Sequence, residues 1–78
     1  MAQLTRLSEV EKNGKAVISK IPSGNAGKMR LMELGLLPGT LIRLIRRAPM
    51  GDPIEIEVRG SLISLRKQEA DLIEVQLA

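Results

Sequence analysis

The clearest pattern in the chain is a strict alternation of apolar and charged residues over residues 54–59, IEIEVR. A period of two is typical of a strand with one buried face. It places Ile54, Ile56 and Val58 toward a core and leaves Glu55 and Glu57 on the opposite face. This segment is the reference for the rest of the predicted sheet.

A second strand is predicted directly after it, joined by a two-residue link at residues 60–61, Gly-Ser. Glycine at the first central position favours a type II′ hairpin. That turn sets Val58 opposite Ile63 and Glu55 opposite Arg66. The apolar residues of both strands then share one face.

The strand that precedes the alternating segment begins at about residue 41. One register sets Ile42 opposite Val58 and also sets Arg43 opposite Glu57, so both faces agree on it. Each buried apolar side chain contributes about 1.5–3 kcal/mol, whereas an exposed ion pair contributes about 0–1 kcal/mol. The apolar face therefore determines the register.

The first third of the chain predicts a helical turn and a strand. Residues 8–11, SEVE, have the spacing of a capping box and predict one short turn that ends at residues 13–14, Asn-Gly. The strand is expected over residues 16–21, where Val and Ile favour extended structure. Residues 22–24, Pro-Ser-Gly, end it.

One substantial helix is predicted over residues 26–34, capped by Asn25 and ended by Gly35 in a left-handed conformation. Residues 37–40, Leu-Pro-Gly-Thr, favour a type II turn because proline fixes the first φ and glycine supplies a positive second one. The helix is expected to carry a broad apolar face made by Met29, Leu31, Met32 and Leu34.

The end of the chain predicts a short helical turn over residues 67–70 and a last strand over residues 72–76. About five short strands, with one helix after the first strand, indicate a mainly β fold that curls to bury one face. We expect a small, partly open SH3-like barrel rather than an OB-fold, since the chain is short and the helix comes early.

Composition then narrows the function. The chain has 78 residues, 12 Lys and Arg against 9 Asp and Glu, and no His, Cys, Phe, Tyr or Trp. It predicts a single domain over residues 1–78. Imidazole bases, thiolate nucleophiles, tetrahedral zinc sites and aromatic base-stacking platforms are excluded. The absence of disulfides and of apolar runs long enough to span a bilayer suggests a cytoplasmic protein.

The charged and glycine-rich segments give only weak indications of phosphate or nucleic-acid binding. Residues 24–29, GNAGKM, lack the spacing of a phosphate-binding loop and the Ser or Thr that reaches magnesium. Phosphate-driven binding of nucleic acid needs a denser stripe of cations than this chain offers. Six basic residues could form a patch, although a solvated face is the better interpretation: Lys28, Arg30, Arg46, Arg47, Arg59 and Lys67.

Three acidic residues are candidates for metal or acid–base chemistry: Asp52, Glu55 and Glu57. They lack an apolar pocket that would raise one pKa, and their basic neighbours are expected to occupy them. Thioether ligands from Met29, Met32 or Met50 are the less favoured interpretation, since methionine more often fills a core or forms an adaptable contact surface.

The loop over residues 48–53, APMGDP, is a plausible docking feature for a partner. Two prolines stiffen it, Gly51 permits an unusual φ, and Met50 is expected to stand exposed at its tip. Leu36 and Leu37 either add to the same surface or pack under the barrel.

Several long strings of residues resemble one known family. Residues 30–40 (RLMELGLLPGT), 46–56 (RRAPMGDPIEI), 58–60 (VRG) and 65–66 (LR) closely resemble the ferrous iron transport protein A family, FeoA. The resemblance extends from about Leu7 to Val75. It implies an SH3-like barrel that serves as a cytosolic accessory to FeoB, the membrane ferrous iron transporter with a cytosolic G-protein domain, and that is not an enzyme.

The resemblance and the composition together predict that the protein acts by contact with the transporter rather than through a reactive group or a bound metal. Tight capture of ferrous iron would be expected to use His or Cys, so we expect no bound metal or cofactor. We expect a location in the cytoplasm, or at the inner face of the membrane through the transporter. The predicted contact residues are Met29, Arg30, Leu36, Leu37, Arg47, Met50, Gly51 and Asp52.

Two other functions remain open from the sequence. One is a small barrel that binds nucleic acid. The other is a weak metal-sensing module that uses Asp52, Glu55 or Glu57.

Overall fold

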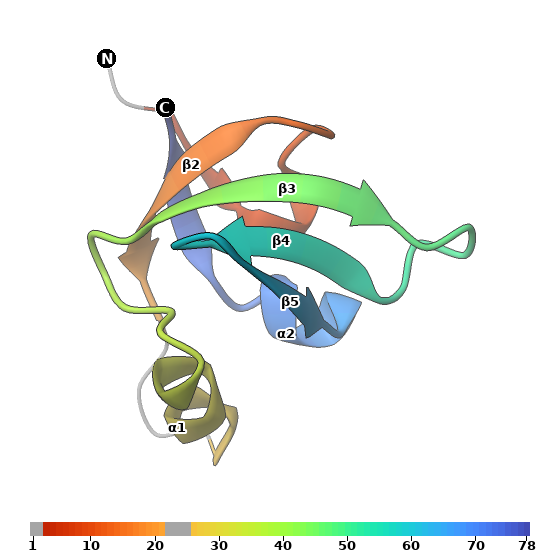
Figure 1. Ribbon diagram of the computed structural model, residues 1–78. Coiled ribbons are helices and arrows are strands. Elements are labelled where there is room, and N and C mark those ends of the chain that lie inside the picture. Colours follow the sequence, from red (N-terminus) through yellow and green to blue (C-terminus); the bar gives the residue numbers. More distant parts are fainter. Residues whose placement is uncertain (1–2, 22–25) are drawn as a thin grey trace.

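The computed structural model describes residues 3–21 and 26–78, which form one curled, open antiparallel sheet with three short helical segments (Figure 1). The six strands lie in the order β1-β6-β2-β3-β4-β5. The predicted mainly β, SH3-like class is confirmed, with one strand more than expected. The elements are β1 (Leu4–Arg6), η1 (Leu7–Glu9), β2 (Lys15–Lys20), α1 (Ala26–Glu33), β3 (Leu41–Arg47), β4 (Ile54–Val58), β5 (Ser61–Leu65), α2 (Lys67–Ala70) and β6 (Glu74–Leu77).

The core lies inside the curl of the sheet and consists of aliphatic side chains. In β4 the alternation predicted from the sequence holds at every position, with Ile54, Ile56 and Val58 buried. Because the chain has no aromatic residue, many interlocking aliphatic side chains fill the interior. The buried apolar residues also include Leu7, Val10, Ala16, Ile18, Ile21, Leu31, Leu36, Ile42, Leu44, Leu65, Ala70, Ile73 and Val75.

The register of β3 against β4 agrees with the prediction. Ile42 lies opposite Val58, and Arg43 lies opposite Glu57. An irregularity after Leu44 then moves Arg46 opposite Glu55. The extra residue is typical of a β-bulge, which bends its strand and helps a short sheet to curl.

The predicted hairpin between β4 and β5 is wrong by two residues. Val58 lies opposite Ser61 and Ile56 opposite Ile63, so the two-residue turn is made by Arg59 and Gly60. Both turn residues have positive φ, 51° and 83°, as a type I′ turn requires. A shift of two positions keeps each side chain on its predicted face, but it removes the expected pairing of Glu55 with Arg66.

The first helical turn is present, although Ser8 does not cap it. Arg6 precedes η1 and makes no side-chain capping bond, while Ser8 lies inside the turn and donates its hydroxyl to the Asp71 carboxylate. β1 was not predicted, because three residues that pair with the edge of β6 have no buried face to give a pattern.

The boundaries of α1 agree with the prediction within one residue. Gly35 has the expected left-handed φ of 90°, and the Thr40 N–H donates to the Leu37 carbonyl at 3.0 Å across the Pro-Gly turn. The predicted cap at Asn25 and the strand stop at residues 22–24 lie outside the described residues. The last strand begins at Glu74, two residues later than expected.

Candidate functional site

Helix α1 exposes two methionines on the side that faces away from the core. Leu31 is buried and Leu34 packs partly against the core, whereas Met29 is 69% exposed and Met32 is 46% exposed. The expectation of one broad apolar face is wrong for a geometric reason. At about 100° per residue, the two leucines lie close together on one side of the helix and the two methionines lie on the other. We call Met29 and Met32 the methionine face.

The methionine face borders a shallow hollow of about 450 Å³, lined by Lys28, Met29, Met32 and Glu33. Methionine is unbranched and polarizable, so it adapts to irregular apolar partners. Two of them exposed side by side on one helix are typical of a contact surface rather than of a solvated face.

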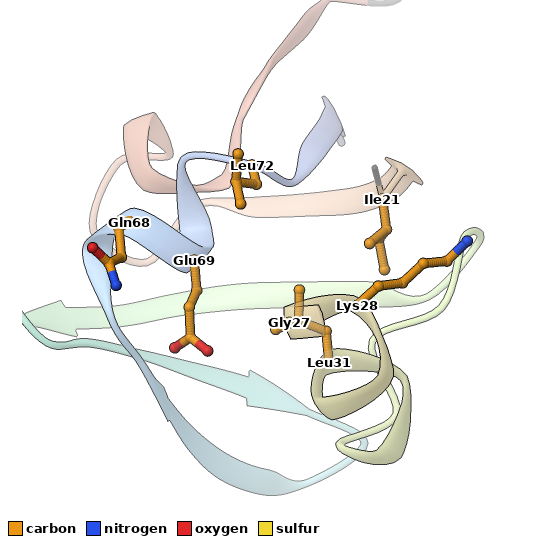
Figure 2. A pocket seen from close by; sticks show the side chains of 7 residues that line it. All are labelled: Ile21, Gly27, Lys28, Leu31, Gln68, Glu69 and Leu72. Carbon is orange, nitrogen blue, oxygen red and sulfur yellow. The ribbon is translucent and has the colours of Figure 1, made fainter. Parts of the chain in front are cut away.

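A second cleft, also of about 450 Å³, lies between α1 and α2 (Figure 2). Its apolar lining comes from three separate parts of the chain: Ile21 directly after β2, Leu31 of α1 and Leu72 after α2. Lys28, Gln68 and Glu69 provide the polar rim. Leu72 is 47% exposed, so part of the apolar lining is accessible from the surface.

An ion pair between Arg30 of α1 and Glu69 of α2 joins the two helices that border this cleft. Glu69 also accepts the backbone N–H of Arg66 at 2.9 Å, which anchors its carboxylate at the start of α2. Arg30, predicted as a partner contact, therefore first serves to hold α1 against α2.

The structure divides the predicted contact residues between two places. The turn that contains Leu37 enters β3, and the loop that contains Met50 leaves it, so the two residues lie at opposite ends of that strand (Figure 1). A seven-residue strand is about 23 Å long. Leu36, with 0% exposure, belongs to the core and cannot take part in a surface contact. The remaining predicted contact residues stay a prediction, divided between the two ends of β3.

The β3–β4 loop has the exposed tip that the sequence predicts. Met50 is 92% exposed, and Gly51 has a positive φ of 84°. Asp52 anchors the loop, because its carboxylate accepts the Lys67 N–H at 3.0 Å and lies 3.9 Å from the Arg66 guanidinium.

Arg47, also predicted as a contact residue, is occupied within the molecule. Its guanidinium donates to the carbonyls of Ser8 and Val10, each at 2.6 Å. These bonds tie the end of β3 to the η1 turn. We therefore assign Arg47 a structural role.

The acidic metal candidates are paired with arginines as expected. Glu55 lies 2.5 Å from Arg46, and Glu57 lies 3.4 Å from Arg43. Within residues 3–21 and 26–78, no three acidic side chains gather as a metal site would require. Glu55 and Glu57 thus form two ion pairs between neighbouring strands, β3 and β4.

The basic patch is largely neutralised. Arg30, Arg46 and Lys67 each pair with a carboxylate, and Arg47 binds backbone carbonyls. In the described part of the chain, only Lys28 and Arg59 of the six basic residues lack an ion pair or hydrogen bond from their side chains. Two free cations are a weak base for phosphate-driven binding.

One carboxyl group has a shifted pKa. The hydroxyl of Ser8 hydrogen-bonds to Asp71 and lowers the pKa of that carboxyl below its ordinary value of 3.8, with a further contribution from Lys67 at 3.3 Å. Burial acts in the opposite direction but is outweighed. The lowered pKa keeps Asp71 ionised, which suits a structural link rather than an acid–base group.

Sequence reasoning missed Met32, Ile21 and Leu72 as members of a surface. Met32 could have been predicted, because residues three apart in a helix, such as Met29 and Met32, lie on the same side. The cleft residues Ile21 and Leu72 come together only through tertiary packing, and no spacing in the sequence links them.

Comparison with known proteins agrees with this geometry. Residues 5–77 match the FeoA domain, which is nearly the whole chain. The chain belongs to the FeoA family. The family is associated with ferrous iron transport and is not a known enzyme family.

One curated relative joins the FeoA domain to a transporter. A protein of Porphyromonas gingivalis, described as an Fe(2+) transport protein A/Fe(2+) transporter FeoB fusion protein, is 33% identical over 72 residues, which are 92% of this chain. This chain spans only 8% of that relative's length.

Two solved FeoA structures share the fold. The FeoA-like protein of Clostridium acetobutylicum is 38% identical, with a TM-score of 0.90, covering 99% of this chain and 90% of its own. The FeoA of Stenotrophomonas maltophilia, an SH3 domain protein solved with zinc, is 29% identical with a TM-score of 0.74, covering 91% and 88%.

Within residues 3–21 and 26–78, no helix has both the length and the apolar character needed to cross a bilayer.

Proposed function

We propose that this FeoA domain supports ferrous iron uptake as a cytoplasmic accessory protein that binds a cytosolic segment of a FeoB-type transporter. The observation that carries the proposal is the methionine face of α1 beside the open α1–α2 cleft. The Porphyromonas gingivalis relative, in which both components are one polypeptide, supports FeoB as the partner.

Binding is driven by apolar side chains of the partner. A helix laid along α1 can cover Met29 and Met32 and insert one side chain into the cleft against Leu31 and Leu72. Each apolar side chain that becomes fully buried contributes about 1.5–3 kcal/mol, so two or three anchors give a useful complex.

The ionic residues of the site set its shape and assist orientation. The Arg30–Glu69 pair holds the two walls of the cleft, and Lys28 offers a free ammonium group at the rim. We assign this chain no catalytic step. It acts on iron by changing which conformation of the transporter's cytosolic domain is favoured, which requires only that it bind one conformation better than another.

The test compares Met29→Glu/Met32→Glu with Met50→Glu for binding to the purified full-length FeoB-type transporter from the same organism, measured by calorimetry. Glutamate is a good helix former, so α1 is retained. We expect the double variant to bind at least tenfold more weakly and Met50→Glu to bind as the unmodified protein does. Circular dichroism confirms that both variants are folded.

The control, Met50→Glu, also replaces an exposed methionine by glutamate. Met50 lies in the loop after β3, whereas α1 precedes that strand. If Met50→Glu abolishes binding and the α1 variant does not, the contact lies on the β3–β4 loop. If the unmodified chain does not bind the transporter, the proposal is wrong.

A further inference from the structure

The outer edge of β5 is a second surface that the proposed function does not use. β5 is the last strand in the order of the sheet and pairs only with β4 (Figure 1). Among the described residues, its backbone makes no hydrogen bond on the other side. Proteins usually shield such an edge with charges, proline or a covering element, because it is a template for another strand.

The hairpin register identifies the groups on this edge. Ser61 flanks the two-residue turn, so Ser61, Ile63 and Leu65 exchange hydrogen bonds with β4. The N–H and C=O groups of Leu62 and Ser64 therefore point away from the sheet. The Leu62 side chain is 64% exposed, and Ser64 is exposed as well. β5 contains neither a proline nor a charged residue.

The charges at both ends of β5 are positive. Arg59 precedes the strand and has no ion pair or hydrogen bond from its side chain within residues 3–21 and 26–78. Arg66 and Lys67 follow it, with side chains 67% and 57% exposed despite contacts to Asp52 and Asp71. A strand laid along this edge meets cations at each end.

This pattern disfavours a second copy of the chain. Antiparallel pairing that overlaps all five residues of β5 sets Arg59 opposite Lys67 of the second copy, and the symmetry repeats that clash at the other end. Like charges directly opposite one another destabilise a strand pair. Acidic residues at the same places stabilise it.

We propose that the outer edge of β5 binds an extended segment of another protein with acidic residues at both ends, which adds a strand to the sheet. The two outward residues each offer one donor and one acceptor to its backbone. Leu62 offers an exposed apolar contact on the outer face. This site is separate from the methionine face, so it does not depend on the proposed function.

The probe is a synthetic nine-residue peptide with two glutamates at each end and alternating valine and threonine between them. Hydrogen exchange followed by NMR on the full chain reports where it binds. We expect saturating peptide to slow exchange of the Leu62 and Ser64 amides at least tenfold. A peptide with lysines at the ends is expected to bind at least tenfold more weakly.

A matched pair of variants isolates the backbone contact. Ser64→Pro removes an N–H that does not bond to β4, so the fold is kept while peptide affinity falls at least tenfold. Ser64→Thr keeps the N–H and is expected to bind as the unmodified chain does. Met29→Glu/Met32→Glu is also expected to bind the peptide normally.

Several results overturn the proposal. The proposal is wrong if Ser64→Pro and Ser64→Thr bind the acidic peptide with equal affinity, or if the acidic and basic peptides bind equally well. It is also wrong if the peptide slows amide exchange only in α1 or β1, or if no binding occurs at millimolar peptide. If Met29→Glu/Met32→Glu loses transporter binding but still binds the peptide, the β5 edge and the methionine face are independent sites. The two proposals can then fail separately.

Discussion

Individual side chains in this domain often do structural work at positions where the sequence suggests contact with a partner. Arg47 is the clearest case, because its charged group is exposed in part yet binds two backbone carbonyls of a distant turn. Arg30 is a second case, since it joins α1 to α2. A cation on the surface is therefore not automatically available to a ligand.

Replacing Arg47 by alanine is expected to lower the free energy of unfolding by about 1–3 kcal/mol, because two charge-assisted hydrogen bonds to the Ser8 and Val10 carbonyls are lost. Arg47→Lys should retain part of that free energy. Arg46→Ala, which breaks an exposed ion pair, is the control and should cost less than about 1 kcal/mol. Urea unfolding measures all three; equal losses at the two positions contradict the structural role of Arg47.

At the scale of the elements, the β4 alternation and the β3–β4 register could be predicted because buried apolar side chains mark a face every second residue. The β4–β5 turn could not, because a shift of two residues preserves both faces and only the turn residues decide. Here Arg59 takes a left-handed conformation that a sequence reader would assign to glycine. β1 could not be predicted because it has no buried face. The methionine face was not predicted because all four apolar residues of the helix were expected on one side.

The hairpin turn is expected to gain stability from Arg59→Asn. Arg59 has a φ of 51°, and asparagine followed by Gly60 is the preferred pair for a type I′ turn. We expect the free energy of unfolding to rise by about 0.5–1 kcal/mol. Arg59→Gln removes the same charge without the conformational preference and should give no gain. A larger gain for glutamine would show that relief of positive charge, rather than backbone conformation, is responsible.

At the scale of the whole molecule, hydrogen bonds between residues far apart in sequence hold the helical segments together beside the open sheet. Ser8 of η1 bonds to Asp71, which follows α2, so this contact joins the beginning of the chain to its last third. Such links could not be predicted, since neither residue has a pattern that points to the other. The predicted contact residues are also divided at this scale, because β3 separates Leu37 from Met50.

The Ser8–Asp71 link predicts how the fold responds to acid. The pKa of Asp71 is lowered in the folded state, so its contribution to stability is complete above pH 3.8 and is lost as the pH falls through the folded value. The unfolding free energy is therefore expected to decrease with acid in this range. Ser8→Ala removes the largest cause of the shift and should flatten that dependence, as urea unfolding from pH 2 to 7 would show. Ser64→Ala, at an exposed serine, should leave the dependence unchanged.

The pairing of β1 with β6 has a consequence for larger assemblies. Leu4 lies opposite Gln76, so the chain enters and leaves the sheet at one margin, away from α1 (Figure 1). A domain whose two ends lie close together can be inserted into a longer polypeptide with both junctions at one place. With both ends at one margin, a connection to further chain there leaves α1 at a distance from the junction (Figure 1).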